Sequence, residues 1–560
     1  MYKNLYFLHH AKIRKISLLR HLFNVQFFRS NHNGSGLPSI LLFKLAINHA
    51  RNQPFDKPAI IDVKSGTQNS YQNLISDIIE FKTRLLLKES EKKDLNKARI
   101  AFLFPNGYEY VVSQWSIWSA GGIAVPLCIT HPPPELLYVL KDSQASKIIV
   151  HPEYYDKIKD VAKDAKIDNV LVYEYQKKQK KNGKSDFKIP SLFPMDINRR
   201  ALIIYTSGTT GKPKGVVLTH ANIQAQINSL VEAWKYNKTD KILHVLPLHH
   251  MHGILNALNC TLFAGGTVEM MKKFDAELVW NRFMRPERDL TLFMAVPTIY
   301  SKLIQHYKNN ILPEKQSLAT ESCSQFRLMV SGSAPLPNSI RNQWKEISGQ
   351  VLLERYGMTE IGMGLSHEYE IEKRYEGCIG VPLPGVQVRL MSEDGKDITN
   401  TYEQPEELQI KGPNVFKEYW NKPEETKKEF TKDGWFKTGD IAMKTEKEKV
   451  FKILGRSSVD IIKSGAYKLS ALEVENSLQA HPNILEIVIV GVEDQVWGQK
   501  VAALIKLKDP KLNLDLQQLR EYAKTNLASY KIPSLLKIVD EIPRNAMGKV
   551  NKKELIKYFD

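Results

Sequence analysis

The sequence lacks the features that define a membrane-spanning or disulfide-stabilised protein. None of its apolar runs reaches 18 residues, so we predict no stable membrane insertion. Its cysteines show no CxxC spacing, which argues against a zinc site or a disulfide framework and favours a reducing compartment. They are Cys128, Cys260, Cys323 and Cys378. At 560 residues the chain is too long for one compact core, so two or more domains are expected.

Acidic residues are absent from positions 1–55, which hold eight lysines or arginines; the first acid is Asp56. Apolar residues there recur at helical spacing, from Leu8 to Phe23, with basic residues off that stripe. A basic amphipathic helix without acids is typical of a mitochondrial targeting peptide, although serine is scarce here. We predict such a peptide at residues 1–30 and a matrix location, with a surface-binding helix as the alternative. NHNGSG at 31–36 is predicted to be a flexible joint.

The net charge of +18 raises the question of a nucleic-acid partner. Part of this charge belongs to the acid-free N-terminal segment, and most other lysines are interpreted as solvated surface. The remainder can help to attract small polyanionic ligands. We predict no nucleic-acid partner.

Short apolar strands alternate with helical patterns from about residue 38. ARIAFLFPNG (98–107), GIAVPL (122–127) and ASKIIV (145–150) are interpreted as strands, and YEYVVSQWSIWSAGG (108–122) as a helix. Such alternation predicts an α/β fold with mostly parallel sheets flanked by helices. Near Gly455 the pattern changes to a smaller run of helices and strands that ends in a lysine-rich segment. We therefore predict a large N-terminal domain at 38–456 and a small α+β C-terminal domain at 457–560.

A strand followed by a loop of small and charged residues occupies ALIIYTSGTTGKPKGVVLTH, residues 201–220. Its glycines let the backbone approach a ligand, and successive N–H groups in such a loop form an anion-binding nest. It is not the GxxxxGK[ST] pattern, because Pro213 follows the lysine. A purely structural turn does not need four hydroxyls and two lysines. Phosphate contacts are predicted from Thr206, Ser207, Gly208, Thr209, Thr210, Gly211, Lys212 and Lys214.

YTSGTTGKPKG resembles the signature of the acyl-adenylate-forming superfamily, which includes acyl-CoA synthetases, luciferases and peptide-synthetase adenylation domains. The resemblance covers about residues 38–558, with further motifs in the family's order. These are LPLHHMHG (246–253), MAVPTIY (294–300), LMVSGSAPLP (328–337), ERYGMTE (354–360), GWFKTGD (434–440), ILGRSSVD (453–460) and PRNAMGK (543–549). The resemblance implies an AMP-forming acyl-CoA synthetase that uses ATP, CoA and Mg2+ and has a mobile C-terminal domain.

The family motifs also imply the nucleotide contacts. Tyr356 offers an aromatic face to adenine, and the turn of Gly332, Ser333 and Ala334 borders both adenine and the acyl pocket. Asp440 is expected to accept hydrogen bonds from the ribose hydroxyls, because a carboxylate is acceptor-only, and Arg456 to assist it.

Two residues of ERYGMTE are expected to act on the phosphates. Glu360 is expected to hold Mg2+, a hard cation that takes oxygen ligands and neutralises phosphate charge. Thr359 is expected to meet the α-phosphate.

The C-terminal motifs imply how two half-reactions share one site. Lys549 is expected to stabilise the negative charge that develops during adenylation. The C-terminal domain is then expected to rotate about a hinge at Ser458, where many relatives carry Asp or Lys instead. Gly465 is expected to leave space for the pantetheine arm of CoA. His250 matches the family's gating histidine.

The acyl substrate is predicted from Arg355, which ERYGMTE places beside the acyl pocket. A buried arginine needs a partner, either Glu354, a backbone carbonyl or a negatively charged substrate. Arg355, His252 and Ser333 together suit a second carboxylate on a short acid. ERYGMTE, LPLHHMHG and PLPGVQVRL resemble malonyl-CoA synthetases of the mitochondrial type that also takes methylmalonate, although GLSHEYE (364–370) departs from them. An ordinary short or medium-chain monocarboxylic acid is the alternative substrate.

Other classes of protein are weighed against this interpretation. An adenylation domain that loads a carrier protein normally stands beside a carrier module, for which we expect no room in this chain. A luciferase-like oxygenase shares the ATP motifs, but nothing here indicates an oxidisable acid. A catalytically dead nucleotide-binding protein does not need intact Lys549, Glu360 and Asp440.

Overall fold

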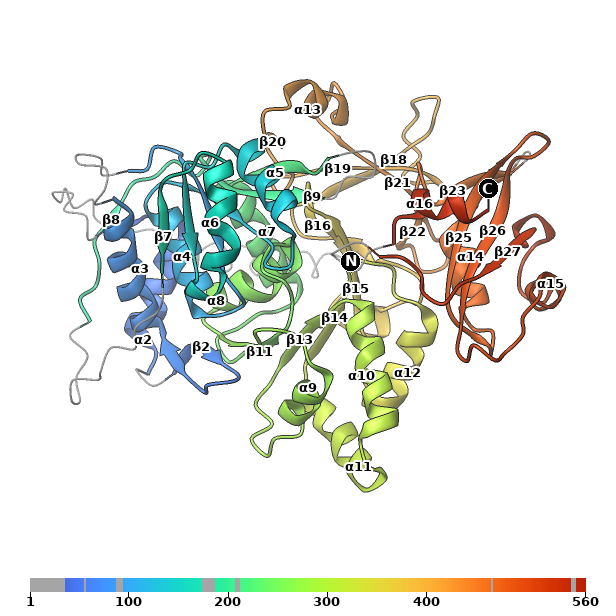
Figure 1. The fold of residues 1–560 in the computed structure, drawn as a ribbon, viewed down its shortest axis with the longest axis horizontal. Helices are drawn as coiled ribbons and strands as arrows, with labels where there is room; N and C mark the ends of the chain where they lie inside the picture. The colour runs from blue at the N-terminus through green and yellow to red at the C-terminus, as the bar shows by residue number, and fades with distance from the viewer. Residues whose placement is uncertain are drawn as a thin grey trace, which may run out of the picture.

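The computed structural model shows a large body followed by a smaller C-terminal unit (Figure 1). It describes residues 36–54, 57–86, 94–173, 187–206, 212–464, 467–544 and 550–559. The predicted targeting peptide, residues 1–30, lies outside these ranges. Within them, every helix is too short or too polar to cross a bilayer.

One seven-stranded sheet carries the strand that precedes the phosphate loop. Its order is β20–β10–β9–β5–β4–β6–β7. The five strands from β9 to β7 pair in parallel, whereas β10 pairs antiparallel with both β9 and β20. The bounds are β4 (Arg99–Leu103), β5 (Ile123–Pro126), β6 (Lys147–Val150), β7 (Val170–Val172), β9 (Arg200–Thr206), β10 (Lys214–Thr219) and β20 (Glu418–Tyr419).

A nine-stranded sheet carries the ERYGMTE motif. Its order is β17–β16–β15–β14–β13–β11–β12–β2–β3, with a parallel centre and antiparallel pairs at both edges. The bounds are β2 (Pro58–Asp62), β3 (Gln68–Ser70), β11 (Lys241–His244), β12 (Thr267–Met270), β13 (Leu292–Ala295), β14 (Leu328–Ser331), β15 (Leu353–Met358), β16 (Gly362–Ser366) and β17 (Val381–Pro382).

Helices cover both faces of these sheets, which is why most of their central strands are largely apolar. Along β4, Ile100 and Phe102 join the core between the sheets, while Ala101 and Leu103 face the outer helices, as the two-residue period of a strand requires. The core between the sheets includes α2 (Leu41–Asn52), α3 (Tyr71–Leu86), α4 (Tyr108–Ser119), α7 (His220–Ala233) and α8 (Cys260–Ala264).

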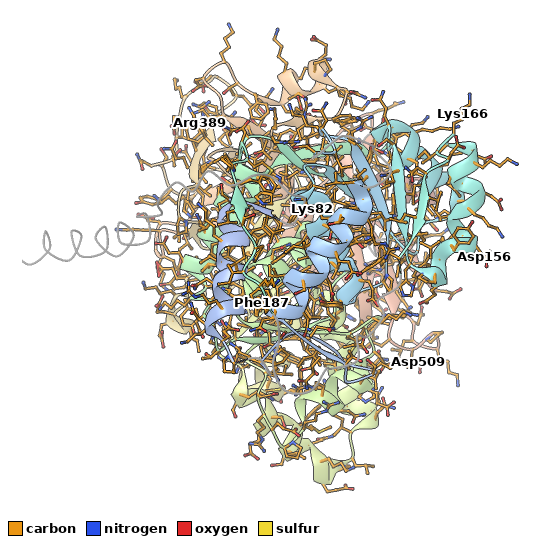
Figure 2. The ribbon with its side chains drawn as sticks, turned by 90° about the vertical axis from the view of Figure 1, so that its left-hand side faces the viewer. Lys82, Asp156, Lys166, Phe187, Arg389 and Asp509 are labelled. Atoms are coloured by element: carbon orange, nitrogen blue, oxygen red, sulfur yellow. The ribbon has the colours of Figure 1, made fainter. Side chains whose placement is uncertain are left out.

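Two further groups of helices cover the outer faces. On the seven-stranded sheet these are α5 (Pro133–Ser143) and α6 (Tyr155–Asp164). Figure 2 shows Asp156 and Lys166, near the two ends of α6, pointing away from the body. On the nine-stranded sheet they are α9 (Ala276–Phe283), α10 (Pro297–Asn310), α11 (Pro313–Ser322) and α12 (Asn338–Ser348).

Two smaller sheets follow along the chain. An antiparallel sheet in the order β18–β19–β21–β22 has the bounds Gln387–Met391, Glu406–Lys411, Phe436–Lys444 and Phe451–Arg456, and α13 (Pro423–Glu429) precedes β21. The C-terminal sheet holds β23 (Ile461–Ser464), β24 (Tyr467–Ser470), β25 (Ile484–Asp494), β26 (Gly498–Leu507) and β27 (Leu535–Ile538), with α14 (Ala471–Leu478), α15 (Leu516–Lys524) and α16 (Lys552–Leu555). The chain passes from one sheet to the other between residues 456 and 461, where the sequence predicts the domain boundary.

The predicted α/β class is confirmed, with a large N-terminal part and a small C-terminal one. The strands predicted within 98–107, 122–127 and 145–150 and the helix predicted within 108–122 are β4, β5, β6 and α4.

Candidate active site

The predicted phosphate loop connects β9 to β10. Lys214 pairs with Thr206 across this hairpin, and residues 207–211 between them lie outside the described residues. That range contains Ser207, Gly208, Thr209, Thr210 and Gly211. Lys212 Nζ lies 5.7 Å from the centre of the Tyr138 ring.

Lys214 connects this hairpin to the acidic residue predicted to hold a metal. Its Nζ lies 4.6 Å from the centre of the Tyr419 ring, and the Tyr419 hydroxyl donates a 2.8 Å hydrogen bond to Glu360 Oε1. Lys214 also pairs with Glu425 at 3.3 Å. The β10–β20 pairing brings Tyr419 beside the hairpin, which explains how these distant segments meet.

Glu360 and Thr359 lie in the turn between β15 and β16. Glu360 is 6% exposed, and burial raises the pKa of its carboxyl group, partly offset by the Tyr419 hydrogen bond. A carboxylate fixed through one oxygen beside the hairpin of the predicted phosphate loop has the donor chemistry that Mg2+ prefers. The position therefore fits the metal role predicted for Glu360.

The predicted ribose-binding residues form one connected group. Asp440 and Arg456 are opposite each other in the β21–β22 pairing, and Arg456 Nε donates to Asp440 Oδ1 at 2.8 Å. The Tyr356 hydroxyl donates to Asp440 Oδ2 at 2.5 Å. Burial of Tyr356 beside the Asp440 carboxylate raises its pKa well above the usual value, so Tyr356 stays a neutral donor.

The three residues predicted to contact the acyl group also meet. Arg355 Nη2 donates to Ser333 Oγ at 2.8 Å, and Ser333 Oγ lies 3.4 Å from His252 Nδ1. Arg355 and His252 are 5% and 4% exposed, whereas Ser333 is exposed and marks an opening to solvent. His252 begins the π-helix η2 (His252–Asn259), a rare conformation that is frequently found at functional sites.

Local backbone geometry makes this contact possible. Ser333 has a φ of 70°, a left-handed conformation that is uncommon for residues other than glycine and is often held at functional sites. A Cβ at Gly332 would lie 2.5 Å from Arg355 Nε, so the glycine is required for the guanidinium to lie there.

Two polar atoms of this cluster are buried without a hydrogen-bond partner among the described residues: Arg355 Nε and His252 Nε2. Burial, followed by the charge of Arg355, lowers the pKa of His252 well below its usual value, so its ring is neutral. In the tautomer whose Nδ1 accepts from the Ser333 hydroxyl, Nε2–H remains as a donor. Together with Arg355 Nε it then offers two donors to an acceptor-only group such as a carboxylate.

The alternative that Glu354 is the partner of Arg355 is wrong. Glu354 pairs with Arg341 at 3.4 Å, and its neighbour Arg355 contacts Ser333. Consecutive residues of a strand point to opposite faces, which separates the two side chains. Among the described residues, no ion pair involves Arg355.

The remaining predicted residues are placed as follows. His250 lies in the loop after β11, with its ring centre 4.1 Å from that of His249. Ala334 is exposed beside Ser333, and Ser458 is exposed in the turn between β22 and β23. Lys549 and Gly465 lie outside the described residues.

Two features were not predicted from the sequence. The hydrogen bond from Tyr419 to Glu360 joins residues 59 positions apart, and no local sequence pattern predicts it. Cys128, His131 and His249 also gather in space, and the C-x2-H spacing of the first two was a signal that could have drawn attention to them.

The hairpin of the predicted phosphate loop, the buried Glu360 and the Asp440 group are features expected of an AMP-binding enzyme, and comparison with known families shows that class. The chain belongs to that family: it matches the AMP-binding enzymes over residues 47–420 and the AMP-binding enzyme C-terminal domain over residues 473–549. The predicted membership of the acyl-adenylate-forming superfamily is thereby confirmed.

Its relatives include several malonate–CoA ligases. The mitochondrial malonate–CoA ligase ACSF3 of Homo sapiens is 43% identical, over 95% of this chain and 96% of its own. The malonate–CoA ligase of Arabidopsis thaliana is 39% identical, over 96% of this chain and 92% of its own. The crystal structure of ATP-bound MatB from Rhodopseudomonas palustris is 30% identical and superposes with a TM-score of 0.79, covering 92% of this chain and 98% of that one.

Proposed function

We propose that this protein ligates malonate to CoA through a malonyl-adenylate, with methylmalonate as a second substrate. A carboxylate oxygen of the acid attacks the α-phosphorus of ATP and pyrophosphate leaves. The CoA thiol then attacks the adenylate carbonyl, losing its proton, and AMP leaves. The names of the human and Arabidopsis relatives support this assignment.

The observation that carries the substrate assignment is the buried Arg355. Its guanidinium has a hydroxyl partner but, within the described residues, no carboxylate, and its Nε has no hydrogen-bond partner there. Burying an arginine without a counter-charge is costly unless a ligand supplies one. The second carboxylate of malonate supplies it, and His252 Nε2 adds a further donor at the same place.

The other residues of the proposed site bind the nucleotide and its metal ion. Asp440 and Arg456 orient the ribose, Tyr356 and the turn of Gly332 to Ala334 border the adenine, and Thr206 with the phosphate loop holds the phosphates. Thr359 contacts the α-phosphate, and Glu360 holds Mg2+, which neutralises phosphate charge when bound.

The C-terminal segment completes the site. Lys549 supplies the cation for adenylation. Rotation of the C-terminal domain about Ser458 then removes Lys549 from the site and brings Gly465 and the CoA tunnel there. His250 gates the passage between acid and CoA. Residues 1–30 direct the protein to mitochondria, the compartment named for the human relative.

Pyrophosphate release from ATP tests the proposal, measured with and without CoA on malonate, methylmalonate, acetate and butyrate. We expect malonate to give CoA-dependent turnover with the highest kcat/KM, and about one equivalent of pyrophosphate without CoA. A preference for butyrate or acetate would instead establish the monocarboxylic alternative.

A further inference from the structure

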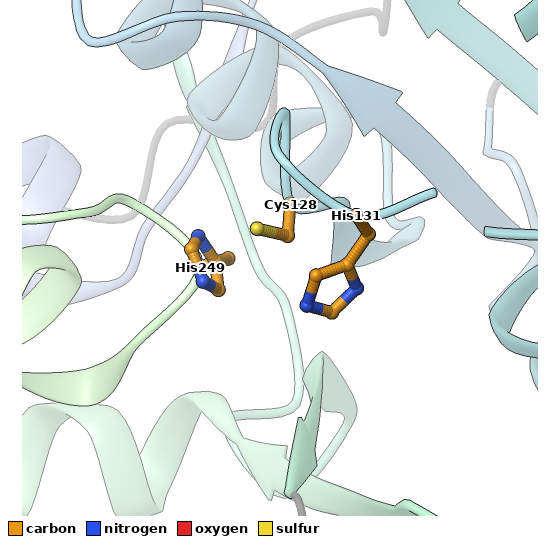
Figure 3. Close-up of side chains that lie close together, drawn as sticks. All are labelled: Cys128, His131 and His249. Atoms are coloured by element: carbon orange, nitrogen blue, oxygen red, sulfur yellow. The ribbon is translucent and has the colours of Figure 1, made fainter. Parts of the chain in front are cut away.

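Three side chains of the types that bind metal ions meet outside the residues assigned above (Figure 3). Cys128 follows β5, His131 precedes α5, and His249 lies in the loop after β11. One ligand atom from each lies within 4.8 Å of the other two. Cys128 is buried, whereas both histidines are partly exposed, so an ion can reach the group from solvent.

A carboxylate lies beside one ring nitrogen of His131. Its Nδ1 lies 3.3 Å from Oε2 of Glu135, one turn further on. Histidines that bind metals almost always donate the other ring nitrogen to a carboxylate, carbonyl or water. The carboxylate at Nδ1 leaves Nε2 for the ion, and in Figure 3 the ring lies with an edge toward His249.

The donor set selects the ion. One thiolate and two imidazoles suit Zn2+, while the oxygen ligands preferred by Mg2+ are not offered by these three side chains. Bond lengths of about 2.0–2.3 Å imply ligand atoms about 3.3–3.7 Å apart around a tetrahedral ion. Because the ligand atoms lie within 4.8 Å of one another, the site needs a contraction of at most about 1.5 Å. Side-chain rotation can provide it, and a fourth position stays open for water.

We propose that Cys128, His131 and His249 form a Zn2+ site that restrains the LPLHHMHG segment and thereby slows turnover. The ring of His249 lies against that of His250, with centres 4.1 Å apart, and His252 follows in the same segment. Because the two rings lie against each other, fixing His249 also restrains His250, which is proposed to gate the passage between acid and CoA. The inhibition rests on the proposed function, whereas the metal binding does not.

Titration of tag-free, full-length protein with Co2+ tests the binding. We expect one equivalent to give a near-ultraviolet thiolate-to-cobalt band and intense visible bands of a tetrahedral site. Cys128→Ser should lose the ultraviolet band, and Glu135→Gln should weaken binding about tenfold. Cys378→Ser is the matched control and should bind like wild type. Absence of the band in wild type, or its persistence in Cys128→Ser, overturns the site.

Turnover in excess Mg2+ tests the restraint. Zn2+ at one bound equivalent should slow pyrophosphate release by wild type and Cys378→Ser several-fold and leave Cys128→Ser unaffected. If Zn2+ displaces Co2+ yet turnover is unchanged, the coupling to the gating segment is wrong. If the protein has no ligase activity at all, the cobalt spectrum still decides whether the site exists.

Discussion

Glu354 and Arg355 are neighbours in β15, yet the Glu354 carboxylate pairs with Arg341 while the Arg355 guanidinium donates to Ser333. The strand directs the Glu354 carboxyl group to a protein partner, and the Arg355 guanidinium to a cluster with two buried polar atoms that have no hydrogen-bond partner among the described residues. We therefore expect different functions for the two residues: Glu354 in the pH dependence of stability and Arg355 in the proposed choice of substrate.

Replacing Arg355 with leucine should impair malonate use far more than butyrate use. Losing one partner of a buried charged pair costs about 3–5 kcal/mol, a factor of hundreds to thousands in kcat/KM. Butyrate has no second carboxylate and needs no such partner. Kinetics of wild type and Arg355→Leu on both acids measure the effect, with butyrate as the internal control for folding. Equal loss on both acids would show that Arg355 is structural.

Glu354→Gln should change how stability depends on pH. Burial raises the pKa of Glu354 to about 8, although Arg341 opposes the shift. The folded state then binds more protons than the unfolded state between about pH 4.5 and 8, so stability falls as pH rises through this window, by up to about 1.4 kcal/mol per unit. Glutamine removes this proton linkage.

Thermal unfolding of wild type and Glu354→Gln from pH 5 to pH 9 checks this expectation. The stability of the variant relative to wild type should increase up to about pH 8 and then level off. A difference that stays constant across the range would place the proton linkage elsewhere.

Short sequence motifs were enough to select residues that the structure brings together. GWFKTGD and ERYGMTE supplied Asp440 and Tyr356, which meet in the structure. The same reasoning left Glu354 open as a partner of Arg355, although the two-residue period of a strand already disfavoured it. Arg341 could not be identified because it comes from α12, and its approach to Glu354 depends on tertiary packing.

Contacts between segments that are distant in the sequence also could not be predicted from it. Tyr419 meets Glu360 because β20 adds to the edge of the seven-stranded sheet, next to β10. His249 meets Cys128 because loops after β5 and β11, which belong to different sheets, lie side by side. No local periodicity encodes the arrangement of two sheets.

Residues 1–30 should be sufficient for import and unnecessary for catalysis. A fluorescent protein fused to residues 1–40 should enter mitochondria, because the segment is basic, amphipathic and free of acids. The matched control replaces Lys12, Lys15 and Arg20 with glutamine and should remain cytosolic. Purified protein that begins at residue 31 should keep full ligase activity. Import of the control fusion would mean that charge is not the signal.

The last prediction separates the two half-reactions through Lys549. Three residues beyond it, Lys552 is held by Asp460 at 2.6 Å and Glu475 at 2.7 Å. Asp460 also accepts a hydrogen bond from the Arg456 backbone N–H, so the end of the chain is anchored beside the proposed hinge. A lysine this close to an anchored point can be delivered to the site and withdrawn as the hinge rotates.

Lys549→Ala should therefore lower adenylate formation from malonate and ATP by a factor of 100 or more, about 2.7 kcal/mol, because a preorganised cation no longer meets the developing charge. Transfer from supplied malonyl-adenylate to CoA should change little, since that step needs the lysine absent from the site. Lys553→Ala is the matched control: this lysine is exposed in α16, and its removal should affect neither step. Rapid-quench measurement of each half-reaction decides the matter. If Lys549→Ala slows both equally, the residue supports the C-terminal domain as a whole and does not act on the adenylation transition state.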